Sequence, residues 1–240
     1  MTNSSHEDFI STVSHELRTP LTSIRGFAQT MLNSWDRLDD TSKKKFLHII
    51  EEQSNRLIHL VENILEVNKL QNDQRTNLHF KAVNSRNIID TVVAIVANQY
   101  KTRKFLIQQA CKLPPIFADE DKFQQVMTNI IENSAKYSFE NTTINIALAI
   151  KDNFVSINVS DTGVEIAEED YEKIFNKFSR LDNPLTRSVQ GNGLGLYITK
   201  NLVDRMNGKI LVSSSNNITS FEVLFPIYNI EEQAGSKWIQ

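Results

Sequence analysis

One histidine near the start of the chain has the surroundings of a nucleophile. His15 stands in the segment Ser-His-Glu-Leu-Arg-Thr-Pro-Leu, residues 14–21. Four polar residues share its face on a helix, namely Ser11, Arg18, Thr19 and Thr22. The ring should therefore face water. A neutral imidazole can attack a phosphoryl group, and the neighbouring carboxylate of Glu16 can accept a hydrogen bond from the other ring nitrogen.

Two asparagines and a lysine form a second set of polar residues. Asn129 and Asn133 are four residues apart in the segment NIIENSAKY, and Lys136 falls on the same helix face. Carboxamide oxygens suit Mg²⁺, which prefers oxygen ligands, and lysine offers a point charge to phosphate. The alternative interpretation is a helix with an ordinary polar outer face.

Two glycine-bearing turns could meet a nucleotide. Asp161-Thr162-Gly163 follows a predicted strand, so its carboxylate can accept a hydrogen bond from an adenine amino group, and Gly163 lets backbone come close. Residues 191–196 read Gly-Asn-Gly-Leu-Gly-Leu directly before a predicted helix, where free amides favour phosphate. The spacing differs from that of a dinucleotide fingerprint or a Walker loop.

Composition excludes several other classes of site. The formal net charge is −3, which gives no reason to expect a nucleic-acid surface. Cys111 is the single cysteine, so an internal disulfide and a thiolate metal cluster are impossible. Hydrophobic residues make up 40% of the chain, which is ordinary for a globular protein, and no stretch approaches the about 18 apolar residues of a membrane span.

The elements that carry His15 are two long amphipathic helices. The first is predicted over residues 7–35, with its apolar residues spaced by threes and fours: Ile10, Val13, Leu17, Leu21, Ile24, Ala28, Met31 and Trp35. Pro20 should bend this helix near Glu16. Asp39, Asp40 and Thr41 are possible caps of the second helix, which runs to about Leu70 with a heptad seam. Such a hairpin is expected to bury its seams by pairing with a second copy.

The rest of the chain alternates between strands and helices. Strands are predicted over residues 78–83, 105–112, 142–150, 154–160, 209–214 and 219–225, and helices over residues 86–101, 121–137, near 168–175 and 194–206. The domains expected are a helical hairpin over residues 1–72, a catalytic domain over residues 73–228 and a tail over residues 229–240. The fold class expected is an all-α helical hairpin, forming a four-helix bundle as a homodimer, followed by an α/β sandwich ATPase domain with a mixed sheet and its helices on one face.

The segment around His15 resembles the phosphoacceptor box of sensor histidine kinases. The resemblance implies that His15 is autophosphorylated and that Glu16 acts as its base. It also implies that Thr19, three positions after Glu16, orients a water for dephosphorylation of a partner. Together with the boxes described next, this segment stands in the order of the same family, and the resemblance covers residues 9–226.

The later boxes resemble the ATP site of these kinases and of the wider superfamily with HSP90, gyrase B and MutL. The resemblance implies that Asn133 is the principal Mg²⁺ ligand, that Asn129 assists it, and that Lys136 lies near the phosphates. Other residues implied to bind the nucleotide are Tyr137, Asp161, Gly163, Gly191, Gly193, Leu194 and Gly195. Phe175 and Phe178 would anchor a lid running to Gln190, and Arg180 and Arg187 are candidates to meet the γ-phosphate.

The same resemblance implies an activity and its partners. The chain would be an ATP- and Mg²⁺-dependent protein histidine kinase, a homodimer that passes its phosphoryl group to an aspartate of a response regulator and also dephosphorylates that regulator. No nucleic acid is expected as a partner. The chain is expected to be the cytoplasmic portion of a membrane-bound sensor, and to meet the membrane only through a sensor region outside this sequence.

Two alternative functions remain open on the sequence. The family box usually reads Asp-x-Gly-x-Gly, whereas Glu165 occupies the position of the second glycine here. A glutamate forced to positive φ would cost about 1 kcal/mol or more, so the chain could be a binding or phosphatase module with impaired autokinase activity. An ATP-driven machine of the HSP90 or MutL type is the second alternative, although those enzymes use a glutamate where this chain has Asn129.

Overall fold

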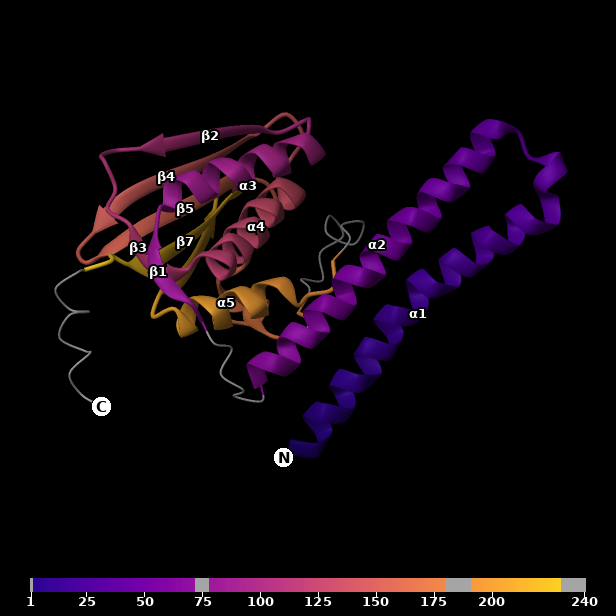
Figure 1. Ribbon diagram of the computed structural model, residues 1–240, viewed down its shortest axis with the longest axis horizontal. Helices are drawn as coiled ribbons and strands as arrows, with labels where there is room; N and C mark the ends of the chain where they lie inside the picture. The colour runs from indigo at the N-terminus through magenta and orange to yellow at the C-terminus, as the bar shows by residue number, and fades with distance from the viewer. Residues whose placement is uncertain (1, 72–77, 180–190, 230–240) are drawn as a thin grey trace. The chain divides into compact units, whose positions relative to one another are not determined.

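The computed structural model describes residues 2–71, 78–179 and 191–229, and the side chains within them from residue 9 onward, except that of residue 71. The chain divides into two compact units, residues 1–72 and residues 73–240. Each unit has its own secondary structure, helical in the first and mixed in the second (Figure 1).

The first unit is a hairpin of two long helices. Helix α1 spans Thr2–Ser34, a short 3₁₀ turn η1 spans Trp35–Arg37, and α2 spans Asp40–Gln71. Asp39 caps α2, because its carboxylate accepts hydrogen bonds from the backbone N–H of Ser42 at 2.7 Å and from the Ser42 hydroxyl at 3.0 Å. These bonds lower the pKa of Asp39. The predicted hairpin is therefore confirmed.

The inner seam of α1 runs through Pro20. The helix continues past this proline, whose side chain is buried, whereas the neighbouring Leu21 remains 53% exposed. Leu21 is one of the apolar residues that predict this helix, and its burial would need the second copy. Inward positions that repeat every 3.5 residues fall at Leu17, Pro20 and Ile24, so Leu21 turns outward.

The second unit is built on a five-stranded mixed sheet. In spatial order its strands are β2 (Lys104–Gln109), β4 (Thr143–Lys151), β5 (Phe154–Thr162), β7 (Ile218–Pro226) and β6 (Lys209–Ser215). Strand β2 pairs parallel to β4, and all other neighbours pair antiparallel. Helices α3 (Ser85–Gln99), α4 (Glu120–Tyr137) and α5 (Gly195–Arg205) lie against one face (Figure 1). The predicted α/β domain is confirmed.

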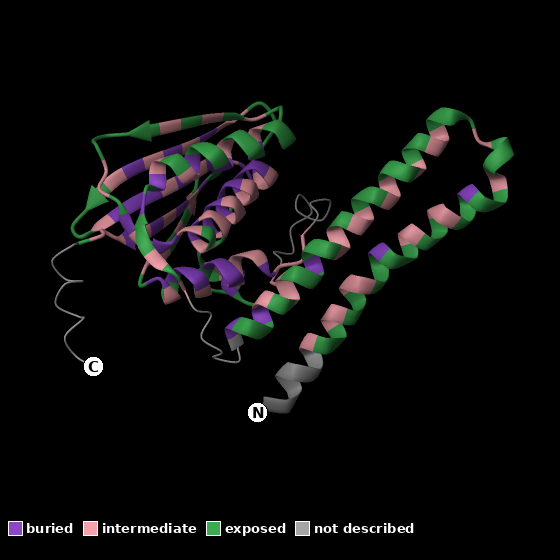
Figure 2. Cartoon of the chain, in the orientation of Figure 1, coloured by how far each residue is buried: buried purple, intermediate pink, exposed green. Residues whose placement is uncertain are grey.

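The core lies between that sheet face and the helices. Strand β4 alternates, with Ile144, Ile146 and Leu148 buried, and the inward residues of β5 and β7 are buried in the same way (Figure 2). Phe123 of α4 meets Phe225 of β7 edge to face, with ring centroids 5.0 Å apart. Alternating burial on the strands and one apolar stripe on each helix explain why these segments adopt a two-layer sandwich.

A second, two-stranded sheet and two short turns differ from the prediction. Strand β1 (Phe80–Val83) pairs antiparallel with β3 (Ile116–Asp119), a strand that the sequence analysis missed because four residues after two prolines show too little alternation. The helix predicted near residues 168–175 is two 3₁₀ turns, η2 (Glu168–Asp170) and η3 (Lys173–Phe175). The hydroxyl of Tyr171 between them bonds to the backbone of Ser214.

Candidate functional site

The histidine segment lies on α1 with its ring open to solvent. His15 is exposed, as are Ser11, Arg18 and Thr22, so the polar face predicted from spacing is present. Thr19 is also exposed, and its hydroxyl donates to the backbone carbonyl of His15 at 3.3 Å. The oxygen of that hydroxyl keeps its capacity to accept a hydrogen bond. A group brought to this face from outside can reach the imidazole.

Glu16, beside His15 in sequence, has a partner on the second helix. Its Oε2 atom lies 3.7 Å from Nη2 of Arg56 on α2, and the side chains of Glu16 and Arg56 are 22% and 27% exposed. This pair joins the two helices of the hairpin. Glu16 is thus less exposed than the histidine that it follows.

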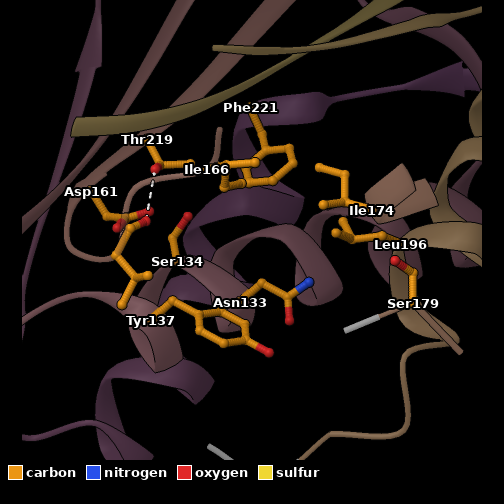
Figure 3. Close-up of a pocket in the computed structure, with 11 residues that line it drawn as sticks. Asn133, Ser134, Tyr137, Asp161, Ile166, Ile174, Ser179, Leu196, Thr219 and Phe221 are labelled. Carbon is orange, nitrogen blue, oxygen red and sulfur yellow. Dashed lines mark hydrogen bonds between the residues drawn. The ribbon is translucent and has the colours of Figure 1, made fainter. Parts of the chain in front are cut away.

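The second unit contains a pocket between α4, the sheet and the segment before α5. Its eleven lining residues are Asn133, Ser134, Tyr137, Asp161, Val164, Ile166, Ile174, Ser179, Leu196, Thr219 and Phe221. About 700 Å³ of space lies among these residues, a figure that includes open solvent. Figure 3 shows Asp161, Ser134 and Thr219 at one end, Ile174, Leu196 and Ser179 at the other, and Asn133 between them.

The polar end of the pocket has two buried oxygens without partners. Asp161 is 4% exposed and Ser134 is 1% exposed. Within the described residues, neither Oδ1 of Asp161 nor Oγ of Ser134 completes a hydrogen bond. Burial raises the pKa of Asp161 to about 7, while the nearby Ser134 hydroxyl lowers it by a smaller amount. A carboxyl group in this state is prepared to accept a hydrogen bond from a donor in the pocket.

Gly163 is required by close packing beside that carboxyl. A Cβ atom at position 163 would lie 2.3 Å from the carbonyl oxygen of Tyr137 and 2.9 Å from Oδ1 of Asp161. The approach is fixed by backbone hydrogen bonds, from Val164 to the Tyr137 carbonyl at 3.2 Å and from Gly163 to Asn217 at 2.8 Å. The glycine therefore brings the end of β5 against the end of α4.

The glycines before α5 bring further predicted residues together. A Cβ atom at Gly191 would lie 3.0 Å from Nζ of Lys136, and one at Gly195 would lie 2.3 Å from Oδ1 of Asn129. The amide nitrogen of Asn129 donates to the buried hydroxyl of Thr199 at 2.7 Å. Asn129 and Lys136 of α4 thus meet the glycine segment, although neither lines the pocket.

The structure describes the two phenylalanines of the predicted lid but not its two arginines. Phe175 is buried. Phe178 has a φ of +57°, and its backbone would meet a Cβ atom at Gly193, whose own φ is +65°. Leu194 is fully buried and its N–H donates to the Asn192 side chain at 3.2 Å. Arg180 and Arg187, like the rest of the lid up to Gln190, lie outside the described residues.

Glu165 is not forced into the conformation that favours glycine. Its backbone φ is not positive, and its side chain is exposed. Positive φ at this position was the physical basis for expecting a cost from glutamate. The remaining difference from the family box is therefore one exposed carboxylate near the pocket.

Sequence reasoning missed most of the apolar lining of the pocket. Thr219 and Phe221 come from β7, and their alternation with exposed residues is the one signal in sequence that they face inward. Ile166, Ile174 and Ser179 come from irregular segments with no periodicity. Leu196 directly follows Gly195, and this position next to the glycines was the one signal in the sequence that it could line the pocket.

The chemistry of the lining suits a magnesium ion that shares its ligands with phosphate. The carboxamide of Asn133 points into the pocket (Figure 3). No group of three or more His, Cys, Asp or Glu side chains that could hold a metal occurs within the described residues. Mg²⁺ typically keeps several waters and uses one or two protein oxygens beside phosphates, so this donor set fits. The amide of Asn129 is already oriented by Thr199.

Two family models match the chain. The model described as His Kinase A (phospho-acceptor) domain matches residues 5–73. The model described as Histidine kinase-, DNA gyrase B-, and HSP90-like ATPase matches residues 118–229. The first match includes His15, and the second includes Asn133 and Asp161.

Relatives and solved structures agree with these matches. The signal transduction histidine-protein kinase ArlS of Staphylococcus haemolyticus is 33% identical over 218 residues, which cover 90% of this chain and 48% of the relative. The sensor histidine kinase WalK of Bacillus subtilis is 32% identical over 215 residues, which cover 86% of this chain and 34% of the relative. The chain thus spans about half the length of the curated relatives it matches, or less.

Two histidine kinase structures resemble the fold. Histidine kinase ThkA, solved in complex with response regulator protein TrrA, gives a TM-score of 0.72 at 26% identity, covering 92% of this chain and 61% of that chain. Histidine kinase AdeS of Acinetobacter baumannii gives a TM-score of 0.68 at 22% identity, covering 90% of this chain and 98% of that chain. No helix among the described residues is both long and apolar enough to cross a membrane.

Proposed function

Because the chain belongs to the family of two-component sensor histidine kinases, we propose that it transfers the γ-phosphoryl group of ATP to His15. The observation that carries this proposal is the exposed His15 in the same chain as a pocket lined by the buried Asp161, whose Oδ1 atom has no hydrogen-bond partner among the described residues. The ATPase family match supports the use of ATP.

The adenine of ATP is proposed to occupy the end of the pocket near Asp161. The Oδ1 atom of Asp161 has no partner within the described residues, and it would accept a hydrogen bond from the amino group of the base. Ile166 and Phe221 would cover the ring, and Tyr137 would lie beside it. The phosphates would extend toward Asn133 and the glycines that precede α5.

Magnesium is proposed to be held mainly by the carboxamide oxygen of Asn133, with Asn129 assisting. When bound, the ion neutralises charge on the phosphate oxygens during transfer. Lys136 would add a positive charge on the same side, because its Nζ atom lies beside Gly191. Arg180 and Arg187 remain proposed contacts of the γ-phosphate.

The transfer step is an in-line displacement at phosphorus. One imidazole nitrogen of His15 forms the new bond to the γ-phosphorus, while the bond to the bridging oxygen breaks and ADP leaves with that oxygen. The proton on the other ring nitrogen is shared with Glu16, which stabilises the developing positive charge. The product is a phosphoramidate on His15.

The phosphoryl group is proposed to pass onward to an aspartate of a response regulator, which binds the exposed face of α1 around His15. The solved complex of ThkA with TrrA supports a partner of this class. Thr19 would orient a water that hydrolyses the regulator's acyl phosphate, which gives the chain phosphatase activity as well. We propose that the reaction takes place in the cytoplasm and that this chain is part of a larger membrane-bound sensor.

Two copies are proposed to pair through their hairpins. Exposed apolar side chains recur along one face of α2, at Leu47, Ile58, Val61 and Leu65. Their spacing of eleven, three and four residues places them in one stripe. A second copy would cover this stripe and complete a four-helix bundle.

Labelling with γ-³²P ATP and magnesium tests the proposed kinase activity. The wild-type chain should take up label that is stable to base and labile to acid, and His15→Gln should take up none. His48→Gln is the matched control, since His48 is also exposed on a hairpin helix, and it should label normally. Steady ATP hydrolysis without a phosphoprotein would instead support a conformational machine of the HSP90 type.

A further inference from the structure

Among the described side chains of the hairpin, the contact between Glu16 and Arg56 differs from three shorter-range contacts between ionisable side chains. Asp40–Lys43, His48–Glu51 and His59–Glu62 are contacts within α2 over three residues. The Glu16–Arg56 pair joins α1 to α2, and both side chains are mostly covered. Charges held partly away from water are screened less by salt than exposed ones.

The position of the pair follows from the heptad pattern of the hairpin. Glu16 directly precedes the seam residue Leu17. Arg56 directly precedes Leu57, which belongs to the heptad seam of α2 together with Ile50 and Ile64. Positions that flank a seam are where charged side chains reach across to the neighbouring helix. The packing of the hairpin therefore fixes where the guanidinium of Arg56 stands relative to Glu16.

We propose that Arg56 is a positioning residue for histidine phosphorylation, acting by holding the Glu16 carboxylate in place beside His15. This inference rests on the proposed function. A carboxylate has two oxygens and about four lone-pair sites, so Oε2 can face Arg56 while the carboxylate also accepts from the imidazole.

The physical benefit is preorganisation. An exposed glutamate samples many rotamers, and most of them direct the carboxylate away from the neighbouring ring. Arg56 restricts that sampling from the second helix. During attack on phosphorus, one imidazole nitrogen bonds to the phosphoryl group, and the proton on the other nitrogen hydrogen-bonds to the held carboxylate. Without Arg56 the same carboxylate is present but is less often in reach.

The alternative is that Arg56 has a purely structural role and only holds α2 against α1. A purely structural contact of that kind would change thermal stability. Any effect of it on the labelling of His15 would be the same whether residue 16 is Glu or Gln. The two alternatives therefore differ in the interaction between substitutions at positions 16 and 56, which a double-mutant cycle measures.

The experiment compares wild type, Arg56→Met, Arg56→Lys, Glu16→Gln and the double variant Arg56→Met with Glu16→Gln. We expect Arg56→Met to lower kcat for labelling of His15 by about tenfold, since small misplacements of reacting groups cost up to ~100-fold. The KM for ATP should stay within about twofold. Arg56→Lys should recover part of the rate because it restores the charge. In the Glu16→Gln background, Arg56→Met should have little further effect.

Controls keep the outcomes separate. Arg25→Met removes an exposed arginine from α1 and should label like wild type. Labelling of His15 by phosphoramidate, a small phosphodonor, bypasses the nucleotide pocket, and Arg56→Met should slow it too. If wild type takes label from phosphoramidate but not from ATP, the proposed kinase function fails while this inference is still tested. Equal rates for wild type and Arg56→Met with both donors, or losses that multiply in the double variant, would overturn the inference.

Discussion

At the scale of single residues, Asp161 is an acidic group that lies almost entirely out of contact with water. Its side chain is buried and lines the pocket, and Oδ1 has no partner within the described residues. The sequence placed this aspartate at the end of a strand but could not show its burial. That burial comes from residues far apart in sequence, including Ser134 on α4 and Thr219 on β7.

The raised pKa of Asp161 predicts a specific dependence of stability on pH. The pKa is about 7 in the folded chain against 3.8 for an ordinary aspartate. Between these values the unfolded chain has lost the proton that the folded chain keeps, so stability falls as pH rises, by up to roughly 4 kcal/mol. Urea unfolding of wild type and Asp161→Asn from pH 4 to pH 8 should show the variant gaining relative stability as pH rises. Parallel curves would contradict the prediction.

Gly195 predicts a second effect that is local and steric. Alanine there would put Cβ 2.3 Å from Oδ1 of Asn129, which must move and weaken its hydrogen bond to Thr199. We expect Gly195→Ala to lower the free energy of unfolding by about 1–3 kcal/mol. Gly26→Ala is the matched control, since no atom lies within 4 Å of its Cβ position, and helix propensity favours alanine by ~1 kcal/mol. Thermal unfolding of both variants provides the measurement.

Glu165 predicts a small effect where the sequence alone left two alternatives. Its φ is not positive and its side chain is exposed, so replacing it by glycine relieves no strain. Glu165→Gly should change the rate of His15 labelling by no more than about fivefold, the effect of removing one exposed charge worth up to ~1 kcal/mol. Glu169→Gly, at another exposed position, is the control. A large rise in labelling would favour the impaired-kinase alternative instead.

At the scale of elements, periodic segments were predictable and short ones were not. The two hairpin helices, α4 and the central strands follow long patterns of period 3.6 or 2, so the sequence located them. Strand β3 is four residues long, and residues 168–175 form 3₁₀ turns, because local hydrogen bonds and contacts with the sheet decide their conformation. Ile166 and Ile174 of the pocket's apolar wall belong to such segments, which explains why their place in the pocket was not predicted.

Within the hairpin, three of the apolar residues that predict α1 are exposed in one chain, namely Ile10 and Trp35 near its ends and Leu21 in its middle. A strict reading of apolar residues selects Leu21, whereas the structure buries Pro20. Proline is apolar and lacks only a backbone donor, so an inward position suits it when the helix continues through it. The expected bend near Glu16 stays a prediction.

At the scale of the whole molecule, the exposed apolar stripe of α2 predicts self-association. Ile58 and Leu65 are each 54% exposed in one chain. The double variant Ile58→Lys with Leu65→Lys should shift the chain from dimer to monomer in light scattering after size exclusion, because burying each side chain contributes about 1.5–3 kcal/mol. Asn55→Lys adds a charge at an exposed polar position of α2 and should leave the dimer intact. A double variant that remains dimeric at micromolar concentration would place the interface elsewhere.

The division of the chain into an early helical unit and a later mixed unit has a consequence for biosynthesis. Residues 1–72 leave the ribosome before residues 73–240, and their local helical contacts can form within microseconds to milliseconds. Synthesis of the remaining residues takes on the order of ten seconds or more at ~5–20 residues per second. Strand β2 must also wait for β4, which follows it only after β3 and α4. The exposed apolar stripe of α2 is therefore available while the chain is still being made. A second hairpin, emerging from another ribosome on the same messenger RNA, can bind it before the sheet of either chain has formed. The proposed dimer can therefore form during translation. Dimers of two chains made from one messenger RNA would then be favoured over dimers of chains made from different ones.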